Sequence, residues 1–281
     1  MNPQILEQRN AINEAASYIK SKISNSPAVG IILGTGMGAL AKEVENSVVL
    51  DYSTIPHFPV STVESHAGRL HLGAFAGKQV FMMQGRFHFY EGYTMRQITF
   101  PIRVMKALGI NTLIVMNAVG SMNALLPASS LVLVQDHINL MGDNPLIGPN
   151  DDDLGPRFPD MSQPYDRELI KLAEKVALEN KISGVHRGIM VAVTGPNLET
   201  AAEYRMFQRM GADIVTMSTV PEVIVAVHGG MRVLGISAVT DGCLPDALKP
   251  ASLEEIIKVA NEAEPRLSKL VRGVVTNLPT I

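Results

Sequence analysis

The sequence of 281 residues contains one cysteine, Cys243, and no tryptophan. A single cysteine excludes both a disulfide framework and a cysteine-rich zinc site. No run of about 18 apolar residues occurs, so we expect no membrane-spanning helix. The first twenty residues are polar and charged, without the apolar core of a signal peptide. This composition favours a cytoplasmic protein in a reducing compartment.

Charged residues are also scarce, at 18% of the chain against about 25% in typical soluble domains. The 24 basic and 27 acidic residues leave a formal net charge of −3, which disfavours a general nucleic-acid binder. Fifteen methionines accompany this low charge. Such a chain either buries an unusually large core or hides part of its surface against other subunits.

Continuous apolar runs alternate with helical segments along most of the chain. We expect buried strands over 29–33, 80–83, 113–116, 131–134, 189–193, 214–217 and 233–239, and helices over 2–24, 94–108, 166–179 and 201–210. Capping boxes at Thr200 and Ser252 indicate further helix starts. The pattern predicts an α/β fold, one domain over residues 1–281, with a central mixed, largely parallel sheet flanked by helices.

A glycine-rich turn, GTGMG from Gly34, follows the first predicted strand and is expected to precede a helix. Glycines let backbone N–H groups approach an anion, and Thr35 adds a hydroxyl donor. The turn is equally consistent with a structural tight turn. With Ala39 it also matches the dinucleotide-binding pattern, and Asp51 stands where a ribose-binding acid would. A nicotinamide-dependent dehydrogenase is therefore an alternative at this point.

A second polar cluster, QGRFHFYEGY, follows the strand at 80–83. In an extended segment Arg86, His88 and Tyr90 point to one face, because side chains alternate with a period of two. A permanent cation, an imidazole and a phenol on one face suit a phosphorylated ligand. A surface ion pair beside a half-buried tyrosine is the plainer interpretation of the same residues.

Polar or acidic groups follow several other predicted strands: Asn117 after 113–116, Glu199 in GPNLETAAE, Ser218 in MSTVPE, and Asp241 after 233–239. Each is consistent with an ordinary turn or cap. We expect six strand ends to meet along one edge of the sheet, where α/β proteins place their sites. The presence of polar or acidic groups at all six strand ends, more than any single motif, predicts an anion-binding active site.

Several motifs, taken together, resemble those of the trimeric purine nucleoside phosphorylases over about residues 29–270. They are GTGMG at 34, FPVSTVESHAGRL at 58, MMQGRFHFYEGY at 82, NAVGS at 117, DHINL at 136, GPNLETAAE at 195 and MSTVPEV at 217. The resemblance implies reversible phosphorolysis of purine nucleosides to free base and pentose 1-phosphate. It implies inorganic phosphate as co-substrate and no metal or organic cofactor, and it outweighs the dehydrogenase alternative.

The resemblance also implies roles for individual residues. Phosphate would be held by Thr35, His66, Arg86, His88, the backbone at Ala118, and Ser218. The residues lining the nucleoside site would be Tyr90, Asn117, Phe158, Leu198, Glu199, Val215, Met217, Asp241 and Leu253. The catalytic residues would be Glu199, Asp241 and His88. His66 would gate the site, and Phe158 would reach into a neighbouring subunit of a homotrimer.

Four positions depart from the family pattern, and the first, Thr35 where relatives commonly carry Ser, keeps the hydroxyl. Asp241 stands where relatives selective for 6-oxopurines usually carry Asn, and methylthioadenosine phosphorylases carry Asp. Glu199, however, is typical of relatives that bind 6-oxopurines. Glu199 therefore favours a 6-oxopurine base, whereas Asp241 favours a 6-aminopurine base. Leu198 replaces a common Phe, and Leu253 stands where a His near the ribose 5′-hydroxyl is usual. A methylthioadenosine or methylthioinosine phosphorylase therefore remains the second candidate, against which Glu199 and Ser218 argue.

Overall fold

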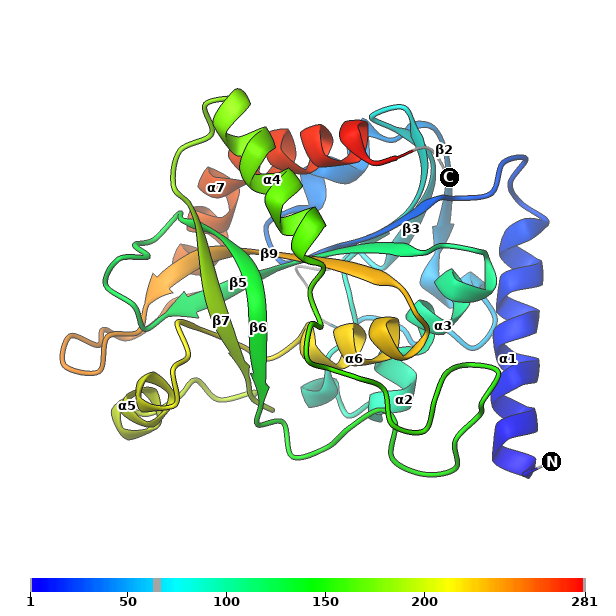
Figure 1. The fold of residues 1–281 in the computed structure, drawn as a ribbon, viewed down its shortest axis with the longest axis horizontal. Coiled ribbons are helices and arrows are strands. Elements are labelled where there is room, and N and C mark those ends of the chain that lie inside the picture. The colour runs from blue at the N-terminus through cyan, green and yellow to red at the C-terminus, as the bar shows by residue number, and fades with distance from the viewer. Residues whose placement is uncertain (1, 63–66, 280–281) are drawn as a thin grey trace.

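A mixed sheet of nine strands forms the centre of the computed structural model, which describes residues 2–62 and 67–279 (Figure 1). Its strands are β1 (Val29–Leu33), β2 (Glu45–Asp51), β3 (Arg69–Phe75), β4 (Lys78–Gln84), β5 (Thr112–Ser121), β6 (Leu131–Asn139), β7 (Val185–Ala192), β8 (Ile214–Thr216) and β9 (Arg232–Gly242). The order across the sheet is β2-β3-β4-β1-β5-β8-β7-β6-β9. This is the mixed α/β architecture that the sequence predicted.

Strand β5 organises the sheet because it has three neighbours. It pairs in parallel with β1 and β9 and antiparallel with β8. Strands β6, β7 and β8 are parallel to one another, and β6 returns antiparallel onto β9. The pairings β5–β9–β6–β7–β8 thus close back onto β5, while β1, β4, β3 and β2 extend from its other side.

Helices cover both faces of the sheet (Figure 1). They are α1 (Pro3–Lys20), α2 (Met95–Ile98), α3 (Phe100–Ala107), α4 (Arg167–Glu179), α5 (Ala201–Arg209), α6 (Val220–His228) and α7 (Leu253–Asn277). Helices α4 and α7 lie together on one face, α6 and α3 lie on the other, and α1 packs beside α3. None of these helices is long and apolar enough to cross a membrane, over the ranges that the structure describes.

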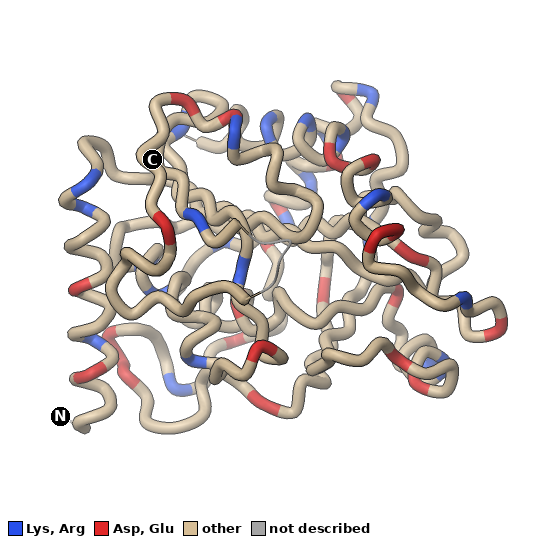
Figure 2. The backbone as a smooth tube through the Cα atoms, turned by 180° about the vertical axis from the view of Figure 1, so that it is seen from behind, with Lys and Arg blue, Asp and Glu red and all other residues tan. Residues whose placement is uncertain are grey.

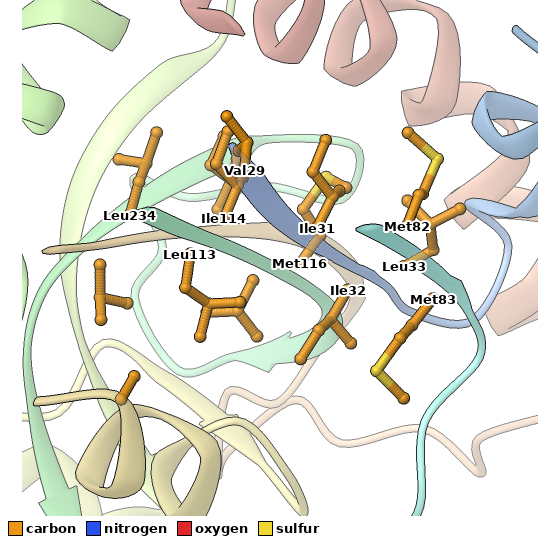
Figure 3. Packing of buried hydrophobic residues seen from close by; sticks show 14 of the residues in the cluster. Val29, Ile31, Ile32, Leu33, Met82, Met83, Leu113, Ile114, Met116 and Leu234 are labelled. Atoms are coloured by element: carbon orange, nitrogen blue, oxygen red, sulfur yellow. The ribbon is translucent and has the colours of Figure 1, made fainter. Parts of the chain in front are cut away.

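The core runs through the middle strands. Figure 3 shows Ile31 and Met82 pointing to one face and Ile32 and Met83 to the other, as strand alternation requires. All four side chains are at most 2% exposed. Burial on both faces explains why these strands read as continuous apolar runs. Charged residues of both signs are interspersed over the outer helices and loops (Figure 2).

Two expected helices are different in the structure. The helix expected over 94–108 is two helices, because Pro101 has no N–H and starts α3 anew after the break at Thr99. The turn at Gly34 leads into a short 3₁₀-helix (Gly38–Glu43), since β2 begins two residues later. Strand β3 was not expected, because its apolar residues alternate with polar or small ones.

Candidate active site

The site residues gather beside the middle of β5. Strand β1 pairs with the first half of β5, over Thr112–Val115, and β8 pairs in the opposite direction with its last residues, Gly120 and Ser121. The carboxyl ends of β1 and β8 therefore approach each other near Asn117. The expectation that six strand ends share one edge is wrong for β7 and β8, because those strands run against β1 and β5.

Asn117 lies at this meeting point, within β5 and not in a turn after it. Its amide nitrogen donates to Thr216 Oγ1 of β8 at 2.9 Å, and its amide oxygen accepts from Ser237 Oγ of β9 at 2.7 Å. Gly34, the residue after β1, packs against the backbone of β5, so that an added Cβ would lie 2.8 Å from Asn117 Cα. Only glycine permits this approach.

Arg86 follows β4 and is only 2% exposed. Its Nη1 donates to Ser218 Oγ at 2.9 Å and to Thr219 Oγ1 at 2.8 Å, and its Nη2 donates to the carbonyl of Met116. Glu222 of α6, with Oε1 3.6 Å from Nη1, supplies the compensating charge. Burial lowers the pKa of Arg86, and the Glu222 carboxylate opposes that shift. The result is a buried guanidinium held among hydroxyl groups.

The connection from β8 to α6 is strained where it meets Arg86. Thr219 has φ 70° and ψ −53° and is buried. The Val220 N–H donates to the Ser218 carbonyl at 2.8 Å, which closes a γ-turn around Thr219. Such a conformation costs on the order of 1–3 kcal/mol and is found mostly at functional sites. Here it places two hydroxyl groups on one guanidinium.

His88 is fixed by Glu91, three residues later. Glu91 Oε1 accepts from the His88 backbone N–H at 2.7 Å and lies 3.0 Å from Nδ1. Since a carboxylate only accepts, Nδ1 carries the hydrogen. Burial acts to raise the pKa of Glu91, but hydrogen bonds from His88 and Thr62 outweigh it and lower the pKa to about 2. The His88 ring also stacks on Tyr90, with ring centroids 4.6 Å apart.

A cavity of about 120 Å³ lies beside β8, lined by Ala118, Val119, Gly120, Leu198, Glu199, Tyr204, Val215, Thr216, Met217, Thr240, Asp241, Cys243 and Ile256. The two carboxylates thus share one small cavity with apolar walls. Met217, whose thioether packs on Gly195, lines this cavity, whereas the next residue, Ser218, contacts Arg86. One short segment therefore joins the carboxylate cavity to the buried cation.

The two carboxylates of this cavity have different surroundings. Burial raises the pKa of Glu199, a hydrogen bond from Tyr204 lowers it, and the nearby charge of Asp241 raises it further. The net direction is upward. Asp241 accepts at both oxygens: Thr240 Oγ1 donates to Oδ1 at 2.8 Å, and Cys243 Sγ donates to Oδ2 at 3.1 Å. The surroundings of Glu199 therefore favour its protonated form.

The structure brings most of the predicted site residues together, and leaves two apart. Thr35 lies in the turn after β1, and Ala118, Leu198, Val215 and Met217 line the carboxylate cavity. Phe158 is 85% exposed and lines a separate cavity with His137 and Ile224. Leu253 is 65% exposed at the start of α7 and lines neither cavity. His66 lies outside the described residues.

Sequence reasoning missed four residues that the geometry places here: Glu91, Tyr204, Glu222 and Cys243. The spacing of three residues between His88 and Glu91 could have indicated their contact. Glu222 contacts a residue 136 positions away, so no local signal marks it. Over the described ranges, no three His, Cys, Asp or Glu side chains are grouped closely enough to hold a metal ion.

The dehydrogenase alternative does not fit this geometry. Dinucleotide binding needs a parallel β-α-β unit with an acid at the end of its second strand. Asp51 instead ends β2, which pairs antiparallel with β3, and it forms an exposed ion pair with Arg69 at 3.2 Å. No α-helix follows the Gly34 turn. The match of this turn to the dinucleotide pattern is a coincidence of glycine spacing.

Comparisons with known proteins identify the family of this chain. Residues 28–276 match the model of the phosphorylase superfamily. The chain is 53% identical to purine nucleoside phosphorylase 1 of Bacillus subtilis, over 95% of this chain and 98% of that protein. A solved structure of isoform 2 of the Schistosoma mansoni purine nucleoside phosphorylase, with cytosine and ribose-1-phosphate, matches with a TM-score of 0.92 and 41% identity. The match covers 96% of this chain and 97% of the chain in that structure.

A second solved structure, a Schistosoma mansoni purine nucleoside phosphorylase in complex with adenosine, matches with a TM-score of 0.91 and 39% identity. The match covers 96% of this chain and 98% of that one. Sequence and fold therefore agree over nearly the whole chain. The chain belongs to the phosphorylase superfamily and, within it, to the purine nucleoside phosphorylases.

Proposed function

We propose that this purine nucleoside phosphorylase uses the Arg86 cluster to hold phosphate and the Glu199–Asp241 cavity to hold the base, with relaxed selectivity between 6-oxopurines and 6-aminopurines. The observation that carries the proposal is the segment at the end of β8. Met217 lines the carboxylate cavity, and Ser218 accepts from Arg86 at 2.9 Å. A ribose lying over this segment would have its C1′ between phosphate and purine.

The phosphate site is proposed from the groups around Arg86. A buried guanidinium with two hydroxyl groups on Nη1 suits an anion with several acceptor oxygens. Thr35 in the glycine-rich turn, the Ala118 backbone and His88 would complete the site. His66 remains a predicted gate. Inorganic phosphate is then a co-substrate, and the chemistry requires no further cofactor.

In the proposed reaction, a phosphate oxygen forms a bond to C1′ as the bond from C1′ to the purine N9 breaks. The bonding electrons leave with the purine, and N7 takes up a proton or a strong hydrogen bond. The transition state has oxocarbenium character, which the adjacent phosphate dianion stabilises. Tyr90, Asn117 and Met217 would position the sugar, so catalysis is positioning and charge stabilisation.

The two carboxylates would set base choice. A 6-oxopurine needs Glu199 ionised to accept from N1–H, and Asp241 protonated. A 6-aminopurine needs Glu199 protonated, and Asp241 as the acceptor for the amino group and N7–H. One proton shared by the pair would serve either base. Leu198 and Val215 would supply apolar contact with the purine faces.

A homotrimer is proposed from the position of Phe158. Its ring is 85% exposed, and the neighbouring Ile147 is 64% exposed. Isolated apolar side chains are common on surfaces, but these two line one cavity and lie on the long loop after β6. A second copy of the chain would cover this loop and receive Phe158 in its sugar site.

The test compares inosine, guanosine, adenosine and methylthioadenosine, each with and without phosphate. We expect phosphate-dependent cleavage of inosine and adenosine by one enzyme. Selective cleavage of methylthioadenosine would favour the second candidate, for which Asp241 is the supporting observation. Replacing Leu253 with His tests that alternative further, because the variant should then lose preference for a 5′-methylthio group. Strict rejection of adenosine would refute relaxed base choice.

A further inference from the structure

Asp241 receives two hydrogen bonds from its own segment. Thr240 Oγ1 donates to Oδ1 at 2.8 Å, and Cys243 Sγ donates to Oδ2 at 3.1 Å. The Thr240 hydroxyl has a second acceptor, the Val119 carbonyl at 3.2 Å, and one hydrogen to share between the two. The Thr240 hydroxyl therefore divides its hydrogen between two acceptors, whereas the Cys243 thiol donates to the Asp241 carboxylate.

The position of Cys243 is built into the fold. The side chain is 2% exposed, and its backbone N–H donates to the Ser121 carbonyl of β5 at 2.7 Å. On β5, Gly120 pairs with Asp241 and lies against the Cys243 thiol. A Cβ added there would lie 2.5 Å from Cys243 Sγ and 3.3 Å from Asp241 Oδ2. A residue without a side chain leaves the space in which thiol and carboxylate meet.

Cys243 stays a thiol at neutral pH. Burial raises the pKa of Cys243 well above its usual range, and the charge of Asp241 raises it further. A thiolate would repel Asp241, whereas a thiol donates to it. The hydrogen bond is weak between neutral groups but is strengthened when the acceptor carries a charge.

Other titratable groups surround Asp241. Glu199, from the loop before α5, and Tyr204, on α5, line the same cavity. Lys249 and Glu255 line the adjoining cavity, which also includes Asp241. Tyr204 is hydrogen-bonded to both Glu199 and Cys243. Burial raises the pKa of Glu199, and the nearby charge of Asp241 raises it further, so the two carboxylates are coupled. A donor on Asp241 therefore directs the shared proton toward Glu199.

We propose that Cys243 is a positioning residue that holds Asp241 as a hydrogen-bond acceptor and so raises the preference for 6-aminopurine over 6-oxopurine nucleosides. The inference rests on the proposed role of Asp241 in base recognition. The thiol contacts neither sugar nor phosphate in this scheme. Tyr204 is hydrogen-bonded to both Cys243 and Glu199, so an Asp241→Asn background is needed to separate the effect through Asp241 from that contact.

The test measures kcat/KM for adenosine and inosine, across neutral and mildly acidic pH, in wild type, Cys243→Ala and Cys243→Ser. Removing the donor should lower the adenosine/inosine ratio about three- to tenfold, the effect of one weak hydrogen bond to a charged group. The acidic limb of the adenosine profile should move to higher pH. Serine restores a donor, so Cys243→Ser should keep the wild-type ratio within about twofold.

The same substitution in an Asp241→Asn background is the control. There the carboxylate is absent, so Cys243→Ala should change the ratio much less than it does with Asp241 present. An equal change in both backgrounds would mean that the thiol does not act through Asp241, and would overturn the inference. So would an unchanged ratio and pH profile in the single variant when wild type cleaves both nucleosides. Wild type that rejects adenosine refutes relaxed base choice instead.

Discussion

Replacing Arg86 with Met separates the two tasks of the guanidinium, stability and phosphate binding. Arg86 is 2% exposed and Glu222 is 3% exposed, with Nη1 and Oε1 3.6 Å apart. Removing one partner of a buried ion pair costs about 3–5 kcal/mol, because the other charge stays buried without compensation. Met fills a similar volume without charge, so we expect the free energy of unfolding to fall by about that amount.

A second substitution, Glu222→Gln, removes the uncompensated charge. The double variant should recover most of the stability lost in Arg86→Met. It should not recover phosphate binding, because the donor to phosphate is still absent. A hydrogen bond to a charged group contributes about 1.5–3 kcal/mol, so the KM for phosphate should rise about 10- to 100-fold in both variants.

The assays are urea unfolding and phosphate titration at saturating inosine. Glu222→Gln alone is the matched control for the loss of the carboxylate. A double variant with wild-type phosphate KM would refute the role of Arg86 in phosphate binding. An Arg86→Met variant as stable as wild type would refute the stabilising role of the buried ion pair.

Three further predictions address the other parts of the site. Asp241→Asn should lower the adenosine/inosine ratio of kcat/KM about tenfold or more, and an unchanged ratio would contradict the two-carboxylate scheme. Glu91→Gln should lower the urea midpoint at neutral pH. Because the pKa of Glu91 is lowered from 4.5 to about 2, its stabilisation is present above pH 4.5 and is lost as the pH falls through about 2, so the difference from wild type should shrink in acid. Phe158→Ala should change stability by at most about 0.5 kcal/mol yet raise the nucleoside KM, and an unchanged KM would argue against a shared site.

Most of the framework could be predicted from the sequence because it depends on local patterns. The apolar run at 29–33 matches β1, and the capping box at Thr200 starts α5 with the expected reciprocal hydrogen bonds. Ser252 also precedes a helix as predicted, although its side chain makes no capping hydrogen bond. Segments with a strong local signal need no tertiary information to be recognised.

Pairing direction could not be predicted, because it is decided between distant segments. The apolar run at 214–217 predicts the strand β8 but not its antiparallel pairing with β5. Because of this pairing, the carboxyl end of β8 lies near the middle of β5 and not at the edge of the sheet. The same limit applies to Glu222, which meets Arg86 only in the folded chain. The positive φ of Thr219 is imposed by packing, since threonine does not favour it.

The contact of Cys243 could not be predicted for another reason. A single cysteine indicates neither a disulfide nor a metal site, and its place two residues after Asp241 does not reveal that the two side chains meet. Its contact with the Asp241 carboxylate depends on Gly120 leaving space on the facing strand. The roles proposed for Thr35, His66 and Leu253 stay predictions.

The most direct test of phosphorolysis by this protein is the fate of inosine with and without inorganic phosphate. We expect no cleavage in phosphate-free buffer, and hypoxanthine and ribose 1-phosphate in equal amounts when phosphate is added. Release of free ribose without phosphate, or no reaction with phosphate present, would contradict it.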